Sequence, residues 1–344
     1  MLIFVNEIPK ITENCILRLN KKYSMKRILS VLSFALLLAS CEGDDGLDFE
    51  VVPPLLLADV IIEDEAEIVE YLQTHFYNYE EFANPPANFD FRIVLDTIAG
   101  DNADRTPLIN QVESRTVTIS SSDFLLDDEE EDIPHTYYIL SAREGLGANP
   151  TFADSTFVRF QGQLLDGQIF DEVTTIAAFD LATFQQPGFG GTRAFRGVGE
   201  GIQQIRAGNE IIDNPDGTFE IPGSGIGMVI FPSGLGTFNG IRSPIPQYAP
   251  LIFTFEVLAT TNADHDGDGI PSFMEDVDGD GLVFNDNTDS GTETFGIFPN
   301  YLDPDDDNDG ISTSEEIIIN ADGTITFPDS DGDGTPDYLD NDTN

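Results

Sequence analysis

Residues 156–171 read TFVRFQGQLLDGQIFD, and this pattern decides which fold the middle of the 344-residue chain adopts. A strand-like run over 156–165 is followed by a glycine turn. Similar short runs recur at 137–142, 228–231 and 251–258, again separated by glycine and proline turns. One short helix is indicated between them, at 199–207. One helix against several antiparallel strands predicts an α+β domain over residues 136–262.

An inserted hairpin is also indicated inside this domain. The sequence Asp213-Asn-Pro-Asp-Gly217 is a strong turn signal, and it lies between the strand-like segments 210–212 and 218–220.

The last part of the chain, residues 263–344, carries one calcium-loop pattern four times. Acidic residues at loop positions 1, 3 and 5 point inward when Gly at position 6 permits a sharp turn, and an acid at position 12 closes the oxygen cage. The second loop has Asn287 at that closing position, so its last ligand stays open. The predicted metal ligands are Asp264, Asp266, Asp268, Glu275, Asp276, Asp278, Asp280, Asp305, Asp307, Asp309, Glu316, Asp329, Asp331, Asp333 and Asp340.

The charge of the chain follows from this repeat. The net charge is -48, from 63 acids against 15 Lys and Arg, and residues 264–344 contain 24 of the acids and no Lys or Arg. Such a segment would not fold unaided, so we expect Ca²⁺ to be structural and its binding to be coupled to folding. The alternative is a disordered acidic tail. A nucleic-acid partner is disfavoured because no basic patch exists.

The N-terminal segment has the features of a lipoprotein. A basic start at Met25 precedes an apolar run that ends in Leu38-Ala-Ser-Cys41, which predicts a signal peptide over 25–40 and a lipid on Cys41. Residues 1–24 would then be an upstream misannotation, and the alternative is an uncleaved membrane anchor. The acidic residues 42–45 resemble the tether of some Bacteroidetes lipoproteins. We therefore expect an outer membrane lipoprotein, periplasmic or surface-exposed, that contacts the membrane through this lipid.

Residues 41–135 form the tether and an N-terminal segment for which no functional motif is found. A helical spacing covers 59–82, and strand-like alternation covers 89–99 and 115–120. The acidic run at 127–132 predicts a solvated loop, with a partner-binding patch as the minor interpretation.

Four motifs of the middle domain, in order, resemble the FKBP-type peptidyl-prolyl cis-trans isomerases. The stretch 156–171 resembles the family pattern V-x-Y-x-G-x-L-x-D-G-x-x-F-D, and FRGVGEG at 195–201 resembles I-x-G-W-x-E-G. The stretches FPSGLG at 231–236 and IPQYAPLIFTFE at 245–256 resemble the two later motifs. The resemblance covers about residues 136–260 and implies a twisted antiparallel sheet wrapped on one short helix, with a pocket between them.

The resemblance also implies a set of pocket residues and a kind of partner. Phe170 and Phe253 would line the proline site, and Asp171 would be its polar residue. The partners would be proline-containing segments of envelope or secreted proteins, and no cofactor would be needed for catalysis. The implied catalytic residues are Phe160, Phe170, Asp171, Phe179, Phe195, Val198, Leu235, Ile245 and Phe253.

Three positions depart from the family. Phe160 stands where Tyr is common, Val198 stands where a Trp forms the pocket floor, and a Tyr is missing near Thr237. These changes predict lowered or lost activity. The alternatives are that the phenylalanines are ordinary core residues and that Asp171 is a turn residue.

Three functions therefore stay open. The first is a lipid-anchored isomerase, the second is a non-catalytic binding module, and the third is a structural surface lipoprotein.

The stretch DPDDDNDGI at 303–311 resembles thrombospondin type 3 repeats, which implies a structural role for calcium. The scattered His75, His135 and His265 do not indicate a zinc site.

Overall fold

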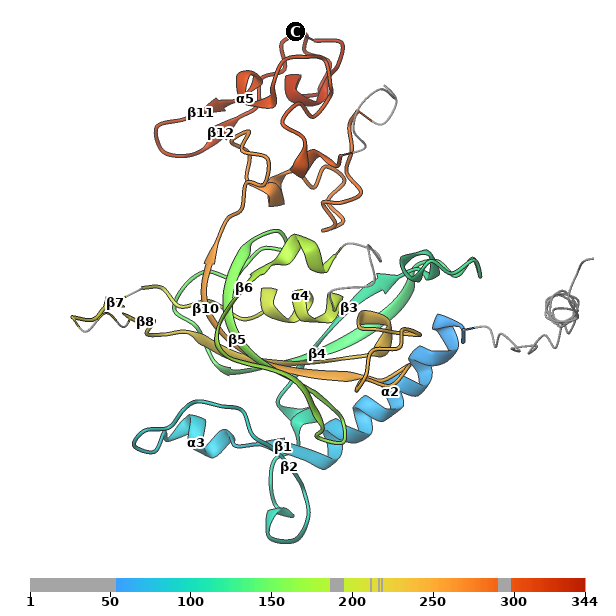
Figure 1. Cartoon of the computed structure of the whole chain (residues 1–344), viewed down its shortest axis with the longest axis vertical. Helices are drawn as coiled ribbons and strands as arrows, with labels where there is room; N and C mark the ends of the chain where they lie inside the picture. Colours follow the sequence, from blue (N-terminus) through green and yellow to red (C-terminus); the bar gives the residue numbers. More distant parts are fainter. Residues whose placement is uncertain are drawn as a thin grey trace, which may run out of the picture. The chain divides into compact units, whose positions relative to one another are not determined.

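The computed structural model describes residues 54–343 apart from 186–194, 211, 216, 218 and 290–297. Cys41 and the signal segment lie outside these residues. Six antiparallel strands form one sheet in the order β3-β4-β9-β10-β5-β6 (Figure 1). Their bounds are β3 Glu113–Ile119, β4 Ile133–Arg143, β5 Ser155–Leu164, β6 Ile169–Asp180, β9 Gly225–Phe231 and β10 Leu251–Thr261. The predicted α+β class is confirmed.

The remaining elements are short except for one helix. The helices are α2 Leu57–Thr74, α3 Tyr79–Ala83, α4 Arg196–Gln203 and α5 Thr313–Glu316. Three two-stranded pairs are β1 His75–Tyr77 with β2 Leu95–Thr97, β7 Ile212–Asp213 with β8 Phe219–Glu220, and β11 Ile318–Ile319 with β12 Ile325–Thr326. Among the described residues, no helix is both long and apolar enough to cross a bilayer.

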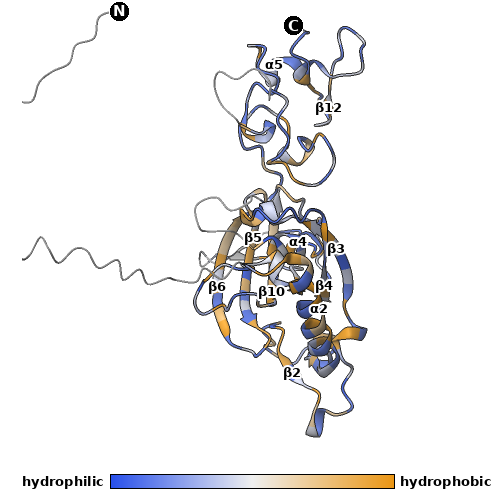
Figure 2. Cartoon of the chain, turned by 90° about the vertical axis from the view of Figure 1, so that its right-hand side faces the viewer, coloured by the Kyte–Doolittle hydropathy of each residue, from blue (hydrophilic) through white to orange (hydrophobic). Residues whose placement is uncertain are grey.

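Both faces of the sheet are buried at its central strands β9 and β10, whereas the edge strands β3 and β6 are largely exposed or half-buried. Successive side chains of a strand point to opposite faces, and on β9 Val229 and Phe231 pack into one hydrophobic cluster while Met228 and Ile230 pack into another. The helix α4 covers the first face, and the C-terminal half of α2 packs on the opposite one (Figure 1), while Leu57 and Val60 at the start of α2 join the first cluster. Hydrophobic residues recur along the strands for this reason (Figure 2).

The helix α4 lies directly on the sheet because two of its glycines leave room for sheet side chains. A Cβ added to Gly197 would come within 2.3 Å of the Phe231 ring, and one added to Gly201 would come within 2.6 Å of Val229. The glycines of the FRGVGEG motif therefore allow a close helix–sheet approach that other residues would prevent.

The helix α2 is tied to the same body by polar contacts at its N-terminal half. Glu130 Oε2 accepts a hydrogen bond from Leu57 N at 2.6 Å, which satisfies a free N–H at the helix start. The buried Asp64 carboxylate accepts from both Ser233 N at 2.7 Å and Ser233 Oγ at 2.6 Å. The acidic run at 127–132 is thus not wholly a solvated loop, since Glu130 caps a helix.

Several expected elements differ in extent. The helical spacing over 59–82 breaks into α2, β1 and α3, because His75–Tyr77 pairs with β2. The alternation over 89–99 forms a strand only at β2, and the middle helix begins at Arg196 rather than 199. The β7–β8 hairpin occurs where it was expected. The predicted middle domain starts at residue 136. Because β3 pairs with β4, the sheet also includes residues upstream of that boundary.

The Asp-rich segment has only small hydrophobic clusters. One contains the buried Ile270, Ile317 and Tyr338. Another joins Val283 and Tyr301 to Ala153 and Ala182 beside the six-stranded sheet. We refer to residues 264–343, as far as they are described, as the array.

Candidate functional site

Five phenylalanines from the motif positions come together between the sheet and α4. Phe253 on β10 is the centre, with its ring centroid 5.5 Å from that of Phe170, 5.5 Å from that of Phe195 and 6.1 Å from that of Phe160. Phe179 lies 5.2 Å from Phe160. Phe195 and Phe253 are buried, whereas Phe160, Phe170 and Phe179 are half-buried. The result is an aromatic cluster with one side partly open to solvent.

A β-bulge and a glycine place Phe170 in this aromatic cluster. Gly162 pairs with Asp171 and Gln163 pairs with Ile169, so Phe170 is the extra residue on β6. A Cβ on Gly162 would lie 2.6 Å from Phe170 Cε2 and 2.9 Å from Phe253 Cε1. The motif glycine is therefore required for the two rings to meet.

The apolar wall of the cluster comes from three other predicted residues. Val198 on α4, Leu235 and Ile245 are all at most 4% exposed and belong to the same hydrophobic cluster as Phe253. Phe231, which we had not included among the site residues, stacks on Phe253 at 5.9 Å. Its place at the start of the FPSGLG motif was the signal that could have identified it.

Polar groups around the aromatic cluster are few. Asp171 is exposed, so its carboxylate is not enclosed with the rings. The Thr237 hydroxyl is buried and has no hydrogen-bond partner among the described residues. The Arg242 guanidinium lies 5.1 Å from the Phe195 ring centroid and brings a positive charge to this wall.

Two cavities lie elsewhere, beside the segment 89–97. One of about 260 Å³ is lined by Phe91, Arg92 and residues of β5, β6 and β10, and one of about 720 Å³ is lined by Tyr71, His75 and residues of β2 and β5. Phe160 is the one predicted site residue that lines either of them.

Eleven of the fifteen predicted metal ligands lie in four groups, within each of which the ligand oxygen atoms lie within 4.8 Å of one another. Glycines at loop position 6 have φ between 82° and 107°, which is the left-handed turn that the pattern requires. The groups are Asp266, Asp268, Glu275 and Asp306; Asp276, Asp278 and Asp286; Asp305, Asp307 and Asp309; and Asp329, Asp331 and Asp333.

Two members of these groups were not expected. Asp306 joins the first loop's group, and Asp286 joins the second loop's group, which lacked a closing acid in the sequence pattern. Asp264 is outside its group and accepts hydrogen bonds from Gly267 N and Gly269 N. Asp280 and Asp340 also lie outside the groups and accept bonds from nearby donors, and Glu316 lies close enough to Asp307 and Asp309 to feel their charge.

The electrostatics of the groups favour a cation. Burial, together with the charge of Asp266, raises the pKa of Glu275 to about 10, and burial with the charge of Asp268 raises the pKa of Asp306 to about 9. Burial also raises the pKa of Glu316 to about 7, with Asp307 adding to the effect. Oxygen-only groups of this kind suit Ca²⁺, and the residues therefore fit the metal that the sequence predicts.

Comparisons with known proteins give the following likenesses. The family model BamM_C, described as BamM C-terminal, matches residues 265–326, which lie in the array. Among curated proteins, no match was found.

Similar solved structures include a peptidyl-prolyl cis-trans isomerase and the proteins FkpA and FKBP42. A peptidyl-prolyl cis-trans isomerase of Pseudomonas syringae is 21% identical and covers 36% of this chain and 75% of its own, with a TM-score of 0.28. FkpA of Escherichia coli is 16% identical, with coverages of 70% and 74% and a TM-score of 0.30. The N-terminal domain of FKBP42 from Arabidopsis thaliana is 12% identical, with coverages of 36% and 86% and a TM-score of 0.28. At these values the likeness says nothing about activity, which has to be argued from the residues of the site.

Proposed function

We propose that this chain is a peptidyl-prolyl cis-trans isomerase of the cell envelope, of the FKBP type. The observation that carries the proposal is the aromatic cluster, in which Phe170, Phe195 and Phe253 stand at the expected motif positions with ring centroids 5.5–6.3 Å apart. Its substrates would be proline-containing segments of envelope or secreted proteins.

The chemistry needs no nucleophile or metal. Rotation about an X-Pro bond breaks amide resonance, with a barrier on the order of 20 kcal/mol. The twisted amide is less polar than the planar one, so an apolar aromatic surface binds it better than water does. Such differential binding lowers the barrier. Phe253, expected beside the proline, is 2% exposed, so the half-buried Phe170 and Phe160 would touch the proline, with the buried Phe253, Val198 and Leu235 behind them.

The test is a protease-coupled isomerisation assay on residues 42–344 in calcium, with a Phe-Pro peptide. Phe170→Ala is expected to lower the rate about tenfold or more, because it opens the aromatic surface that favours the twisted amide. Phe157→Ala is the matched control, since Phe157 lies on β5 and is 38% exposed outside the cluster. Equal rates for the two variants would contradict the assignment of the site.

A non-catalytic binding module is the second candidate. Phe160 and Val198 supply no hydroxyl or indole N–H, and Asp171 is exposed, so few groups remain to hold a peptide backbone in the transition state. In this case the folded wild-type chain has no turnover but still binds a proline peptide. Phe170→Ala would then weaken binding measured by calorimetry, and Phe157→Ala would not.

We further propose that lipid on Cys41 anchors the chain in the outer membrane, periplasmic or surface-exposed, and that Ca²⁺ orders the array. Radiolabelled palmitate should enter the wild-type chain and not a Cys41→Ala variant. Protease added to intact cells would then distinguish the two faces of the membrane.

A further inference from the structure

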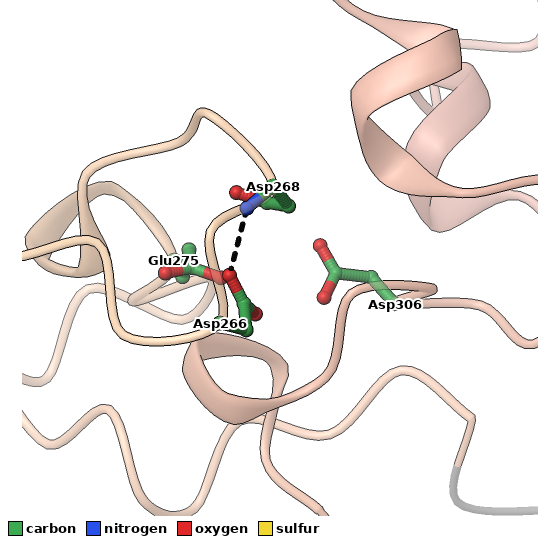
Figure 3. Close-up of side chains that lie close together, drawn as sticks. All are labelled: Asp266, Asp268, Glu275 and Asp306. Atoms are coloured by element: carbon green, nitrogen blue, oxygen red, sulfur yellow. Dashed lines mark hydrogen bonds between the residues drawn. The ribbon is translucent and has the colours of Figure 1, made fainter.

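Four carboxylates, three of them buried and that of Asp266 half-buried, meet where the first and third Asp-rich loops approach each other. Asp266, Asp268 and Glu275 come from the first loop and Asp306 comes from the third, and oxygen atoms of all four lie within 4.8 Å of one another. Figure 3 shows Asp306 on a separate segment, with its carboxylate directed toward the other three. Asp268, Glu275 and Asp306 are 3%, 1% and 2% exposed.

Most oxygen atoms of these carboxylates have no hydrogen-bond partner among the described residues. Among the described residues, neither oxygen of Glu275 or of Asp306 has a hydrogen-bond partner of good geometry, and one oxygen each of Asp266 and Asp268 is also unpaired. Residues 264–344 contain no Lys or Arg. Because a buried, unpaired carboxylate is strongly destabilising, such a group either takes up a proton, in line with the raised pKa values of Glu275 and Asp306, or binds a cation.

The loop pattern explains why Asp306 faces away from its own loop. Asp305, Asp307 and Asp309 occupy positions 1, 3 and 5 of the third loop and form its group. Asp306 occupies position 2, which is not a ligand position of that loop. Its side chain is therefore free to serve a neighbouring loop.

We infer that Asp266, Asp268, Glu275 and Asp306 form one shared divalent-cation site that joins the first and third loops. Four carboxylates and no nitrogen or sulfur ligand suit a hard cation, and Ca²⁺ tolerates such irregular oxygen cages better than Mg²⁺. The inference rests on the calcium part of the proposed function and goes beyond it, since the loops would not act independently.

A cation at the shared site would cross-link two parts of the array that lie far apart in the sequence. The cation would hold Glu275 to Asp306, so the chain between them becomes a closed loop, as it would with a covalent cross-link. Binding at this site would therefore order two loops at once. Tyr338 lies near the site, because it packs against Ile270, whose backbone N–H donates to the Asp268 carboxylate.

The position of Tyr338 allows a direct test with Tb³⁺ as the probe. Tyrosine transfers excitation to a nearby lanthanide, and the chain has no Trp to compete. We expect tyrosine-sensitised Tb³⁺ emission from residues 42–344, displaced by Ca²⁺. In Tyr338→Phe most of this emission is expected to be lost while the number of Ca²⁺ bound, measured by calorimetry, is unchanged.

Asp306→Asn keeps the side-chain shape and removes one ligand charge. It is expected to lower Ca²⁺ affinity at one site by roughly tenfold or more and to reduce the sensitised emission. Asp322→Asn is the matched control, because Asp322 is exposed and bonds only to Thr324 in the β11–β12 turn. It should leave both readouts unchanged.

The outcomes separate the two proposals. If the wild-type chain binds no Ca²⁺, the calcium part of the proposed function is wrong and the shared site with it. If Ca²⁺ binds but Asp306→Asn behaves like Asp322→Asn, the shared site alone is wrong. Emission that is unchanged in both Tyr338→Phe and Asp306→Asn overturns the inference.

Discussion

At the scale of single residues, Gly162 controls the aromatic cluster. Gly162→Ala would place a Cβ 2.6 Å from Phe170 Cε2 and 2.9 Å from Phe253 Cε1, so both rings would have to move. We expect a destabilisation of about 1–3 kcal/mol in urea unfolding and loss of isomerase activity or peptide binding. Gln163→Ala, one residue along β5, is the control. Retention of full activity and stability in Gly162→Ala would contradict the ring positions.

Asp64 predicts a pH dependence of stability at the same scale. Burial raises its pKa to about 6 from 3.8, with the charges of Glu67 and Glu63 adding to the effect and the Ser233 bonds opposing it. A raised folded-state pKa means that the stabilising contribution is present below pH 3.8 and is lost as the pH rises through about 6. The size is up to about 3 kcal/mol, since one pKa unit corresponds to about 1.4 kcal/mol.

The measurement for Asp64 is a difference between two proteins. Asp64→Asn has no charge to titrate, so the wild-type free energy of unfolding should fall relative to that of Asp64→Asn between about pH 4 and pH 6. Calcium is kept saturating so that the array does not contribute. Parallel pH profiles for the two proteins would show that Asp64 titrates normally.

At the scale of elements, α2 is part of the sheet's core although it precedes the motif-bearing domain. Leu72 is fully buried in the hydrophobic cluster on the face of the sheet opposite α4, whereas Ile62 on the same helix is 70% exposed. We expect Leu72→Ala to lower the free energy of unfolding by about 2–5 kcal/mol and Ile62→Ala to change it by less than about 0.5 kcal/mol. Both are read by urea denaturation, and equal small effects would mean that α2 does not pack on the sheet in solution.

At the scale of the whole molecule, the array and the six-stranded sheet should respond differently to calcium removal. The array has only small clusters of its own, such as Ile270, Ile317 and Tyr338, while the sheet has extensive cores on both faces. Chelation is therefore expected to unfold residues 264–343 and leave residues 54–262 folded. Hydrogen exchange before and after chelation measures this, and a single loss of protection throughout the chain would contradict the division.

Most of the sequence predictions rest on patterns of residues that lie close together in the chain. The strand and turn within residues 156–171, the β7–β8 hairpin and the glycine turns at loop position 6 each depend on residues close together in the chain. The α+β class followed from the order of such units. The motif resemblance brought Phe170, Phe195 and Phe253 to one place, although periodicity alone would have left them as core residues.

Only the tertiary structure decided which distant residues meet. The periodicity of α2 indicated an apolar face but not the surface that it covers, and nothing near Asp64 in the sequence points to Ser233. Asp306 is not among the predicted ligands, because it is at a non-ligand position of its own loop. Its place in the first loop's group depends on how the first and third loops pack against each other. Sequence patterns encode the direction of a side chain relative to its own element, whereas its partner is determined by packing of elements far apart in the chain.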